Sequence, residues 1–171
     1  MSATYITEPI APGDAQSGFR CGVHALDDYF ARHAEGNTAQ GVGKTFVLRG
    51  TEEDPAVLGF YTLSMAEIRA EALSDALATK LPKYPLPVAL IGRFAIHAQV
   101  QGRGVAGRLL GDALQRVLEA ASHVGCLGVV VDAKDQRALE FYAKFGFAEI
   151  AQSGWPRRMF VACSVIAGAT K

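Results

Sequence analysis

The sequence predicts a single α/β domain in which helices pack on a mixed sheet. Residues 105–121 carry the clearest helical pattern of the chain, because apolar side chains recur there every three to four positions opposite a charged face. Residues 127–131 form a continuous apolar run, which is typical of a strand buried on both faces. The 171 residues show no internal repeat and no linker, and half of them are hydrophobic. We therefore expect residues 1–171 to form one domain around one core.

The N-terminal half of the chain alternates between strand and helix patterns. In order, we expect a strand at residues 5–10, a helix at 24–36, strands at 45–48 and 57–65, and a helix at 71–81. Pro9 ends the first strand, and Leu26 and Phe30 recur at helical spacing in the first helix. The turn-like residues 50–55 separate the two following strands, and Pro82 closes the second helix.

The C-terminal half continues this alternation. We expect a strand at residues 87–97, the long helix at 105–121, a strand at 127–131, a helix at 135–144 and a strand at 158–166, with residues 168–171 frayed. Leu109, Ala113 and Val117 belong to the apolar stripe of the long helix. Gly146 follows the last helix at a position where glycine commonly ends one.

Charge and cysteine usage exclude several classes of protein. Lys plus Arg and Asp plus Glu are equal at 17 each, so composition does not indicate nucleic-acid binding, although a local basic face stays compatible with it. Cys21, Cys126 and Cys163 are odd in number and widely spaced, which predicts buried free thiols rather than disulfides or a metal site. No apolar run reaches about 18 residues, and residues 1–14 do not resemble a signal peptide. We expect a soluble, cytoplasmic, metal-free protein that does not cross a membrane.

The most informative segment lies between the strand at 87–97 and the long helix. Residues 101–108 are Gln-Gly-Arg-Gly-Val-Ala-Gly-Arg, so three glycines fall within six residues. Glycines let a backbone approach a ligand closely and turn its N–H groups inward. The helix that follows adds unpaired N–H groups and the positive end of its dipole. This combination suits a pyrophosphate, to which Arg103 and Arg108 can add positive charge.

Two other phosphate-binding motifs fit this segment less well. A Walker A loop needs Lys and Ser or Thr after its last glycine, whereas Gly107 is followed by Arg108 and Leu109. The spacing of the three glycines does match a dinucleotide-binding motif, but the acidic residue expected about 20 positions later is only Asp132, which is rather late. A tight structural turn without a ligand remains the third interpretation.

Three blocks of sequence, in the same order and spacing, resemble the GNAT superfamily of N-acetyltransferases. They are residues 92–96 (Gly-Arg-Phe-Ala-Ile), 101–106 (Gln-Gly-Arg-Gly-Val-Ala) and 138–147 (Ala-Leu-Glu-Phe-Tyr-Ala-Lys-Phe-Gly-Phe). The resemblance implies a GNAT-like domain with a mixed, mostly antiparallel sheet, splayed central strands and flanking helices. It also implies acetyl-CoA as the cosubstrate.

The resemblance further assigns the residues that bind acetyl-CoA. Main-chain groups of Phe94, Ala95 and Ile96 would pair with the pantetheine arm as if it were an additional strand. The pyrophosphate would be held by the loop residues Gln101, Gly102, Arg103, Gly104, Val105, Ala106 and Gly107. Asp135 stands where the family normally has an asparagine that helps to bind the cofactor, so this side-chain contact departs from the family pattern.

Tyr142 matches the family tyrosine and is the candidate catalytic residue. A phenol can donate a hydrogen bond or a proton to the departing thiolate of coenzyme A. The alternative is that Tyr142 is only a core aromatic beside Phe141 and Phe145. The sequence does not indicate a general base, and we interpret His97 as a structural residue. A substrate α-amino group of lowered pKa is already partly deprotonated and could react without a general base.

The N-terminal half narrows the resemblance to the tRNA-acetylating toxins of type II toxin–antitoxin modules. Matching segments include residues 21–30, 45–47, 59–64, 92–96 and 112–116, so the likeness covers nearly the whole chain. It implies acetylation of the α-amino group of aminoacyl-tRNA, which blocks translation, by a homodimer that a ribbon-helix-helix antitoxin neutralises.

Binding of tRNA requires basic side chains that contact phosphates. Arg93 is the best candidate for a substrate contact, because it flanks the cofactor strand and matches the family. Further candidates are Arg69, Lys80, Lys83, Arg157 and Arg158. Two other functions stay open: acetylation of a protein N-terminus or a small amine, and a domain that binds coenzyme A or a partner without turnover.

Overall fold

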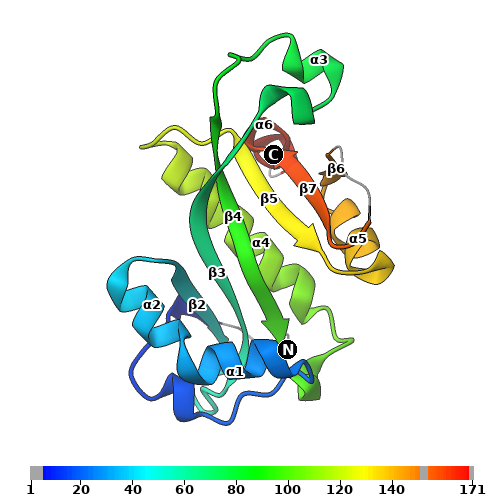
Figure 1. The fold of residues 1–171 in the computed structure, drawn as a ribbon. Helices are drawn as coiled ribbons and strands as arrows, with labels where there is room; N and C mark the ends of the chain where they lie inside the picture. Colours follow the sequence, from blue (N-terminus) through cyan, green and yellow to red (C-terminus); the bar gives the residue numbers. More distant parts are fainter. Residues whose placement is uncertain (1–5, 151–153, 170–171) are drawn as a thin grey trace. The chain divides into compact units, whose positions relative to one another are not determined.

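The computed structural model describes residues 6–150 and 154–169. Within them, seven strands form one mostly antiparallel sheet in the order β1-β2-β3-β4-β5-β7-β6, accompanied by six α-helices (Figure 1). The chain divides into two compact units. The first unit comprises Met1–Ser64 and Ile91–Ala113, and the second comprises Met65–Leu90 and Leu114–Lys171. The strands β3 (Val57–Ile68) and β4 (Leu86–Ile96) and the helix α4 (Val105–Ala121) contribute residues to both units.

The first unit is built on β1 (Ile6–Pro9), β2 (Lys44–Arg49) and the first part of β3, which pair antiparallel. Short 3-10 helices, η1 (Asp14–Gln16) and η3 (Ala98–Val100), and the helices α1 (His24–Arg32) and α2 (Ala34–Gln40) complete it together with parts of β4 and α4. One core cluster of this unit brings the aromatic side chains of Phe19, Tyr29, Phe30 and Phe60 together with Ala95. This cluster ties α1 to the end of β4, where we expect the cofactor.

The second unit is built on β5 (Gly128–Ala133), β7 (Arg157–Ala162) and β6 (Ala148–Glu149). The strand β7 pairs antiparallel with both β5 and β6. The unit also holds η2 (Ala70–Ala72), α3 (Asp75–Ala78), α5 (Gln136–Ala143) and α6 (Cys163–Ala169). Val88, Val130, Ile150 and Phe160 belong to its core. The helix α5 carries Tyr142.

The long helix is confirmed at its predicted bounds, whereas four other elements differ from expectation. The helix expected at 24–36 is two helices, because the backbone of His33 leaves the helical region at φ −124°. The helix expected at 71–81 is η2 followed by α3, because Leu73 and Ser74 have extended ψ values of 173° and 150°. Glu149 and its neighbour form the strand β6, too short for an alternating pattern to predict.

The strand expected at residues 158–166 stops at Ala162, and the chain continues as α6. The register explains the change: Ala162 pairs with Gly128, the first residue of β5, so a longer strand would have no partner there. Residues 163–169 satisfy their backbone groups by forming a helix. Gly168, expected to fray, therefore lies in a helix, while residues 170–171 and Tyr5 lie outside the described residues.

Candidate active site

The glycine-rich turn lies directly before α4 in the first unit. Gly102 and Gly104 have φ values of +79° and +78°, in the left-handed region that other residues avoid. Among the described residues, no atom lies within 4 Å of a Cβ built on either glycine. The glycines are therefore required by the backbone rather than by close packing, and the space around the turn is open to a ligand.

The turn fits an anionic ligand. Residues 101–104 are exposed, and α4 begins immediately after them at Val105. The first N–H groups of a helix have no partner within it, and the helix dipole makes that end positive. Arg103 and Arg108 are both exposed beside the turn. Backbone donors, dipole and two cations thus match the needs of a pyrophosphate, and this favours the cofactor interpretation over a purely structural turn.

The side chain of Gln101 forms hydrogen bonds within the protein, whereas a ligand-binding side chain would point to the ligand. Its Nε2 atom donates to the carbonyl oxygens of Cys21 (2.8 Å) and Ile96 (2.9 Å). The carboxamide therefore fastens the start of the turn to the end of β4 and to the segment before α1. We assign Gln101 to positioning the turn, which leaves its main chain as the part able to face a cofactor.

The strand that precedes the turn holds Phe94, Ala95 and Ile96 at its end. The backbone N–H of Arg93 donates to the Oγ1 atom of Thr62 at 2.9 Å, so its acceptor at this point of β4 is a side chain of β3. The N–H of His97, after the end of β4, donates to a main-chain acceptor, the carbonyl oxygen of Leu58, at 2.7 Å. A side-chain acceptor in place of a main-chain one is a local departure from the regular strand ladder, which is compatible with the cofactor interpretation. The splaying of the central strands stays a prediction.

Gly59 has a structural role in this region that we did not predict from the sequence. A Cβ at this position would lie 2.9 Å from the carbonyl oxygen of Ala95 and 3.2 Å from Leu109 Cδ2. Only glycine therefore lets β3 approach both the cofactor strand and α4 this closely. The signal was present in the sequence as a glycine inside an apolar strand, which often marks a close backbone approach.

His97 has the structural role we expected. Its Nδ1 atom accepts a hydrogen bond from the N–H of Gln99 at 3.1 Å, and its ring packs edge-on against Phe19 at 5.5 Å between centroids. Because Nδ1 accepts this hydrogen bond, the neutral ring carries its proton on Nε2, and neither nitrogen is then available to take a proton from a substrate. His97 is therefore a turn cap rather than a general base.

Tyr142 lies on α5 in the second unit with only 8% of its surface exposed. Its ring packs against Phe141 and Phe147, at 5.3 and 5.5 Å between centroids. Burial, and then the negative charge of Asp132, raise the pKa of Tyr142 to about 12. The phenol therefore stays protonated over the physiological range, so a core position of the ring is compatible with hydrogen-bond donation by the hydroxyl.

Two of the basic side chains considered for RNA binding are engaged within the second unit. Arg158 forms a two-pronged contact with Asp132, its partner in the β5–β7 register, at 2.9 and 3.0 Å. This hydrogen bonding raises the pKa of Arg158. Arg157 contacts Glu149 at 3.3 Å and lies over the ring of Trp155 at 4.4 Å. Neither arginine presents an uncompensated charge, so both are poorer candidates than Arg93.

Asp135 is the N-cap of α5. Its Oδ1 atom accepts a hydrogen bond from the N–H of Ala138 at 2.9 Å, which satisfies one of the open donors of the first helical turn. An aspartate serves this purpose as well as the asparagine of the family pattern. The carboxylate thus has a structural role of its own, and its contact with the cofactor stays a prediction.

The three cysteines are free thiols. Cys21 is buried as expected, whereas Cys126 and Cys163 are half-buried. Burial raises the pKa of Cys21, and burial and the neighbouring Cys126 raise the pKa of Cys163 to about 11. Thiols with raised pKa values are poor nucleophiles, so these two do not suggest an acyl-cysteine route.

Neither a metal centre nor a membrane-crossing helix is found in the part of the chain that the structure describes. Residues 6–150 and 154–169 contain no group of three or more histidine, cysteine or acidic side chains that could hold a metal ion. No helix within these ranges combines the length and the apolar character needed to cross a bilayer.

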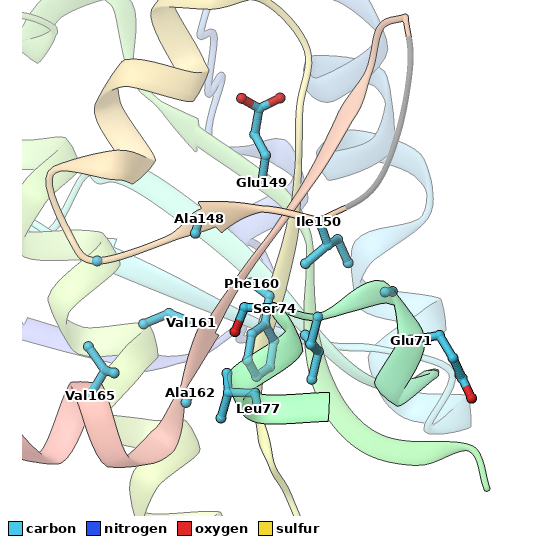
Figure 2. Close-up of a pocket in the computed structure, with 13 residues that line it drawn as sticks. Glu71, Ser74, Leu77, Ala148, Glu149, Ile150, Phe160, Val161, Ala162 and Val165 are labelled. Carbon is cyan, nitrogen blue, oxygen red and sulfur yellow. The ribbon is translucent and has the colours of Figure 1, made fainter. Parts of the chain in front are cut away.

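A hollow of about 410 Å³ in the second unit contains none of the predicted site residues. Its lining is largely apolar and includes Leu77, Phe160 and Val165. Figure 2 shows the carboxylates of Glu71 and Glu149 directed away from the apolar side chains. We therefore assign this hollow no part in binding the charged cosubstrate.

Comparison with known proteins decides the family. The model of the acetyltransferase (GNAT) family matches residues 22–147. The chain belongs to the GNAT acetyltransferase family. It is an N-acetyltransferase, and the matched region contains the turn at 101–107, the end of β4 and Tyr142.

Among its relatives, a protein named tRNA-acetylating toxin from Mycobacterium tuberculosis (strain ATCC 25618 / H37Rv) is 33% identical over 147 residues, which are 86% of each chain. A structure of AtaT complexed with acetyl-methionyl-tRNAfMet aligns with a TM-score of 0.87 at 26% identity and covers 98% of this chain and 100% of that one. A structure of AtaTR bound with acetyl-CoA aligns with a TM-score of 0.82 at 26% identity over 98% of both chains. These likenesses confirm the predicted fold class.

Proposed function

We propose that this N-acetyltransferase transfers the acetyl group of acetyl-CoA to the α-amino group of an aminoacyl-tRNA, and that it acts as a toxin by blocking translation. The observation that carries the proposal is the 33% identity, over 86% of both chains, to a protein named tRNA-acetylating toxin. The structural likeness to AtaT complexed with acetyl-methionyl-tRNAfMet supports the same acceptor. In this proposal residues 1–171 act as one catalytic domain.

Acetyl-CoA supplies the acetyl group as a thioester, and the first unit offers the residues to hold it. The main chain of Phe94, Ala95 and Ile96 lies at the end of β4 and would bind the pantetheine arm. Gly102 and Gly104 turn the backbone toward the open space before α4, where the pyrophosphate would lie. Gln101 fastens the turn to the end of β4, and Gly59 lets β3 approach that strand and α4 closely.

Tyr142 would assist departure of the thiolate by donating a hydrogen bond. A thiol has an ordinary pKa of about 8.5, while burial and Asp132 raise the pKa of Tyr142 to about 12. Complete transfer of the phenolic proton to the thiolate would then be uphill by about 5 kcal/mol. A hydrogen bond that strengthens as negative charge gathers on sulfur avoids that penalty and acts mainly in the transition state.

The acceptor amine must attack in its neutral form. Because His97 is occupied as a turn cap, it does not offer a general base. An α-amino group has an ordinary pKa of about 7.7–8.0, whereas a lysine side chain has one of about 10.4. A substantial fraction of an α-amino group is therefore neutral near pH 7 without a base. This favours aminoacyl-tRNA or another α-amine over a lysine side chain as the acceptor.

The pH dependence of turnover tests this assignment. We expect kcat/KM with aminoacyl-tRNA to rise with pH as the amine loses its proton, and to level off above about pH 8. Because the pKa of Tyr142 is raised to about 12, the donor form persists through the alkaline range and is lost only above it. A pH–rate profile measured up to about pH 10 should therefore show no falling limb. A loss of activity between about pH 8 and 9 in a protein that stays folded would contradict the role of Tyr142.

The proposal includes the partners implied by the family resemblance. We infer a cytoplasmic homodimer that a ribbon-helix-helix antitoxin neutralises. The net charge of zero requires that phosphate contacts be local, and Arg93 is the best-placed candidate in the first unit. Arg69, Lys80 and Lys83 are exposed in the second unit and are further candidates.

Acetylation assays with matched acceptors test the proposed substrate. We expect the purified protein to acetylate charged tRNA, to leave uncharged tRNA unmodified, and to use free amino acids or peptide N-termini far less well. Its KM for charged tRNA should rise steeply with salt, since each phosphate contact releases counterions. Preference for a peptide or a small amine, with a KM that does not depend on salt, would instead establish the alternative acceptor.

A further inference from the structure

The guanidinium of Arg93 lies over a buried aromatic ring. Arg93 is exposed on β4, next to the predicted cofactor strand residues, and its Cζ atom is 3.8 Å from the centroid of the Tyr29 ring. Tyr29 belongs to α1 and is only 5% exposed. A surface cation thus rests on a side chain that is part of the core of the first unit.

The ring beneath Arg93 is itself held in place. Tyr29 stacks on Phe60 with an interplanar angle of 22°, and its hydroxyl accepts a hydrogen bond from Nδ2 of Asn37 at 3.4 Å. The backbone of Arg93 is held separately, by the bond of its N–H to Thr62 Oγ1 at 2.9 Å. Both ends of the arginine are therefore oriented by rigid parts of the unit.

The stacking holds the cation without neutralising it. Across residues 6–150 and 154–169, no carboxylate forms an ion pair with Arg93, in contrast to Arg49, Arg157 and Arg158, which all contact acids. A guanidinium that contacts a ring on one side still offers N–H groups and its other side to a ligand. Those are the parts that bind a phosphate in two-pronged fashion or stack on an unpaired base.

We propose that Tyr29 is a positioning residue for the acceptor substrate: its ring orients Arg93 so that the guanidinium is ready to contact the RNA near the aminoacyl end. The inference rests on the proposed function, because it takes aminoacyl-tRNA as the acceptor. Tyr29 itself touches no substrate. Its effect is to remove the rotamer freedom that an exposed arginine would otherwise lose on binding.

A double-mutant cycle tests the coupling of the two side chains. Tyr29→Leu should raise the KM for aminoacyl-tRNA by about 3–10-fold, in keeping with cation–π contacts at surface sites. It should leave kcat and the KM for acetyl-CoA within about twofold, because Tyr29 acts on acceptor binding alone. Arg93→Gln should raise the same KM at least as much, and the double variant no further. Tyr29→Phe keeps the ring and should restore the wild-type KM, while Arg32→Gln, which removes an exposed charge from α1, should have no effect.

The outcomes separate this inference from the proposed function. If Tyr29→Leu raises KM equally in the wild-type and Arg93→Gln backgrounds, Tyr29 acts through general packing and the inference is wrong. If the wild-type protein does not acetylate charged tRNA, the proposed function is wrong, and the proposed contact of Arg93 with RNA is wrong with it. The stacking can be measured without activity: side-chain NMR signals of Arg93 should be shifted upfield by the ring in the wild type and in Tyr29→Phe. Their absence in the folded wild-type protein would overturn the positioning role by itself.

Discussion

Replacement of Tyr142 by phenylalanine is expected to lower kcat by about 10²–10³-fold, the usual range for loss of one hydrogen-bond donor that stabilises charge in the transition state. The change removes one hydroxyl and keeps the ring that packs against Phe141 and Phe147. The affinity for acetyl-CoA should change little, because the lost hydrogen bond strengthens only as the thiolate forms. Steady-state kinetics with charged tRNA, together with calorimetric binding of acetyl-CoA, measures both quantities.

Stability and growth provide the controls for Tyr142→Phe. The variant should unfold at nearly the wild-type temperature, since the buried ring is retained. Expression of the wild-type chain without an antitoxin should arrest growth, and expression of the variant should not. Wild-type turnover in a stable Tyr142→Phe protein would return Tyr142 to the core aromatics and would leave the departing thiolate to be protonated by another group or by water.

Replacement of Gly104 by aspartate is expected to weaken acetyl-CoA binding by about 100-fold or more. A negative charge placed about 4 Å from a phosphate opposes binding by up to about 4 kcal/mol at the effective dielectric constant of a protein surface. The protein should still fold, because no described atom lies within 4 Å of a Cβ at this position. Gly104 has φ +78°, so any side chain adds backbone strain of about 1–2 kcal/mol.

A neutral substitution separates charge from strain at Gly104. Gly104→Asn has nearly the shape of Gly104→Asp, and asparagine tolerates the left-handed region. We expect Gly104→Asn to weaken binding much less than Gly104→Asp in calorimetric titrations. Equal affinities of both variants and the wild type would show that the pyrophosphate lies elsewhere and that the turn is structural.

Local sequence patterns were sufficient to predict the long helix, the glycine-rich turn and the short helix that carries the candidate tyrosine. The apolar stripe of residues 105–121 predicted α4 at its observed bounds, because helical periodicity shows directly which face is buried. The three glycines at 102–107 predicted a turn against a helix end, and two of them do have the left-handed backbone that only glycine adopts readily. The motif around Tyr142 likewise predicted a tyrosine on a short helix, as observed in α5.

Only the tertiary structure decided which side chains are partners. Asp132 meets Arg158 because β5 and β7 pair in one register, and a shift by one residue would turn these side chains to opposite faces. Arg93 rests on Tyr29, which precedes it by more than sixty positions in the sequence, because the core of the first unit brings α1 to β4. Such contacts are set by strand register and by packing between distant segments, whereas periodicity and motifs describe each segment alone. The sequence therefore determined the family, the turn and the candidate tyrosine, and the fold decided that Arg49, Arg157 and Arg158 contact acids.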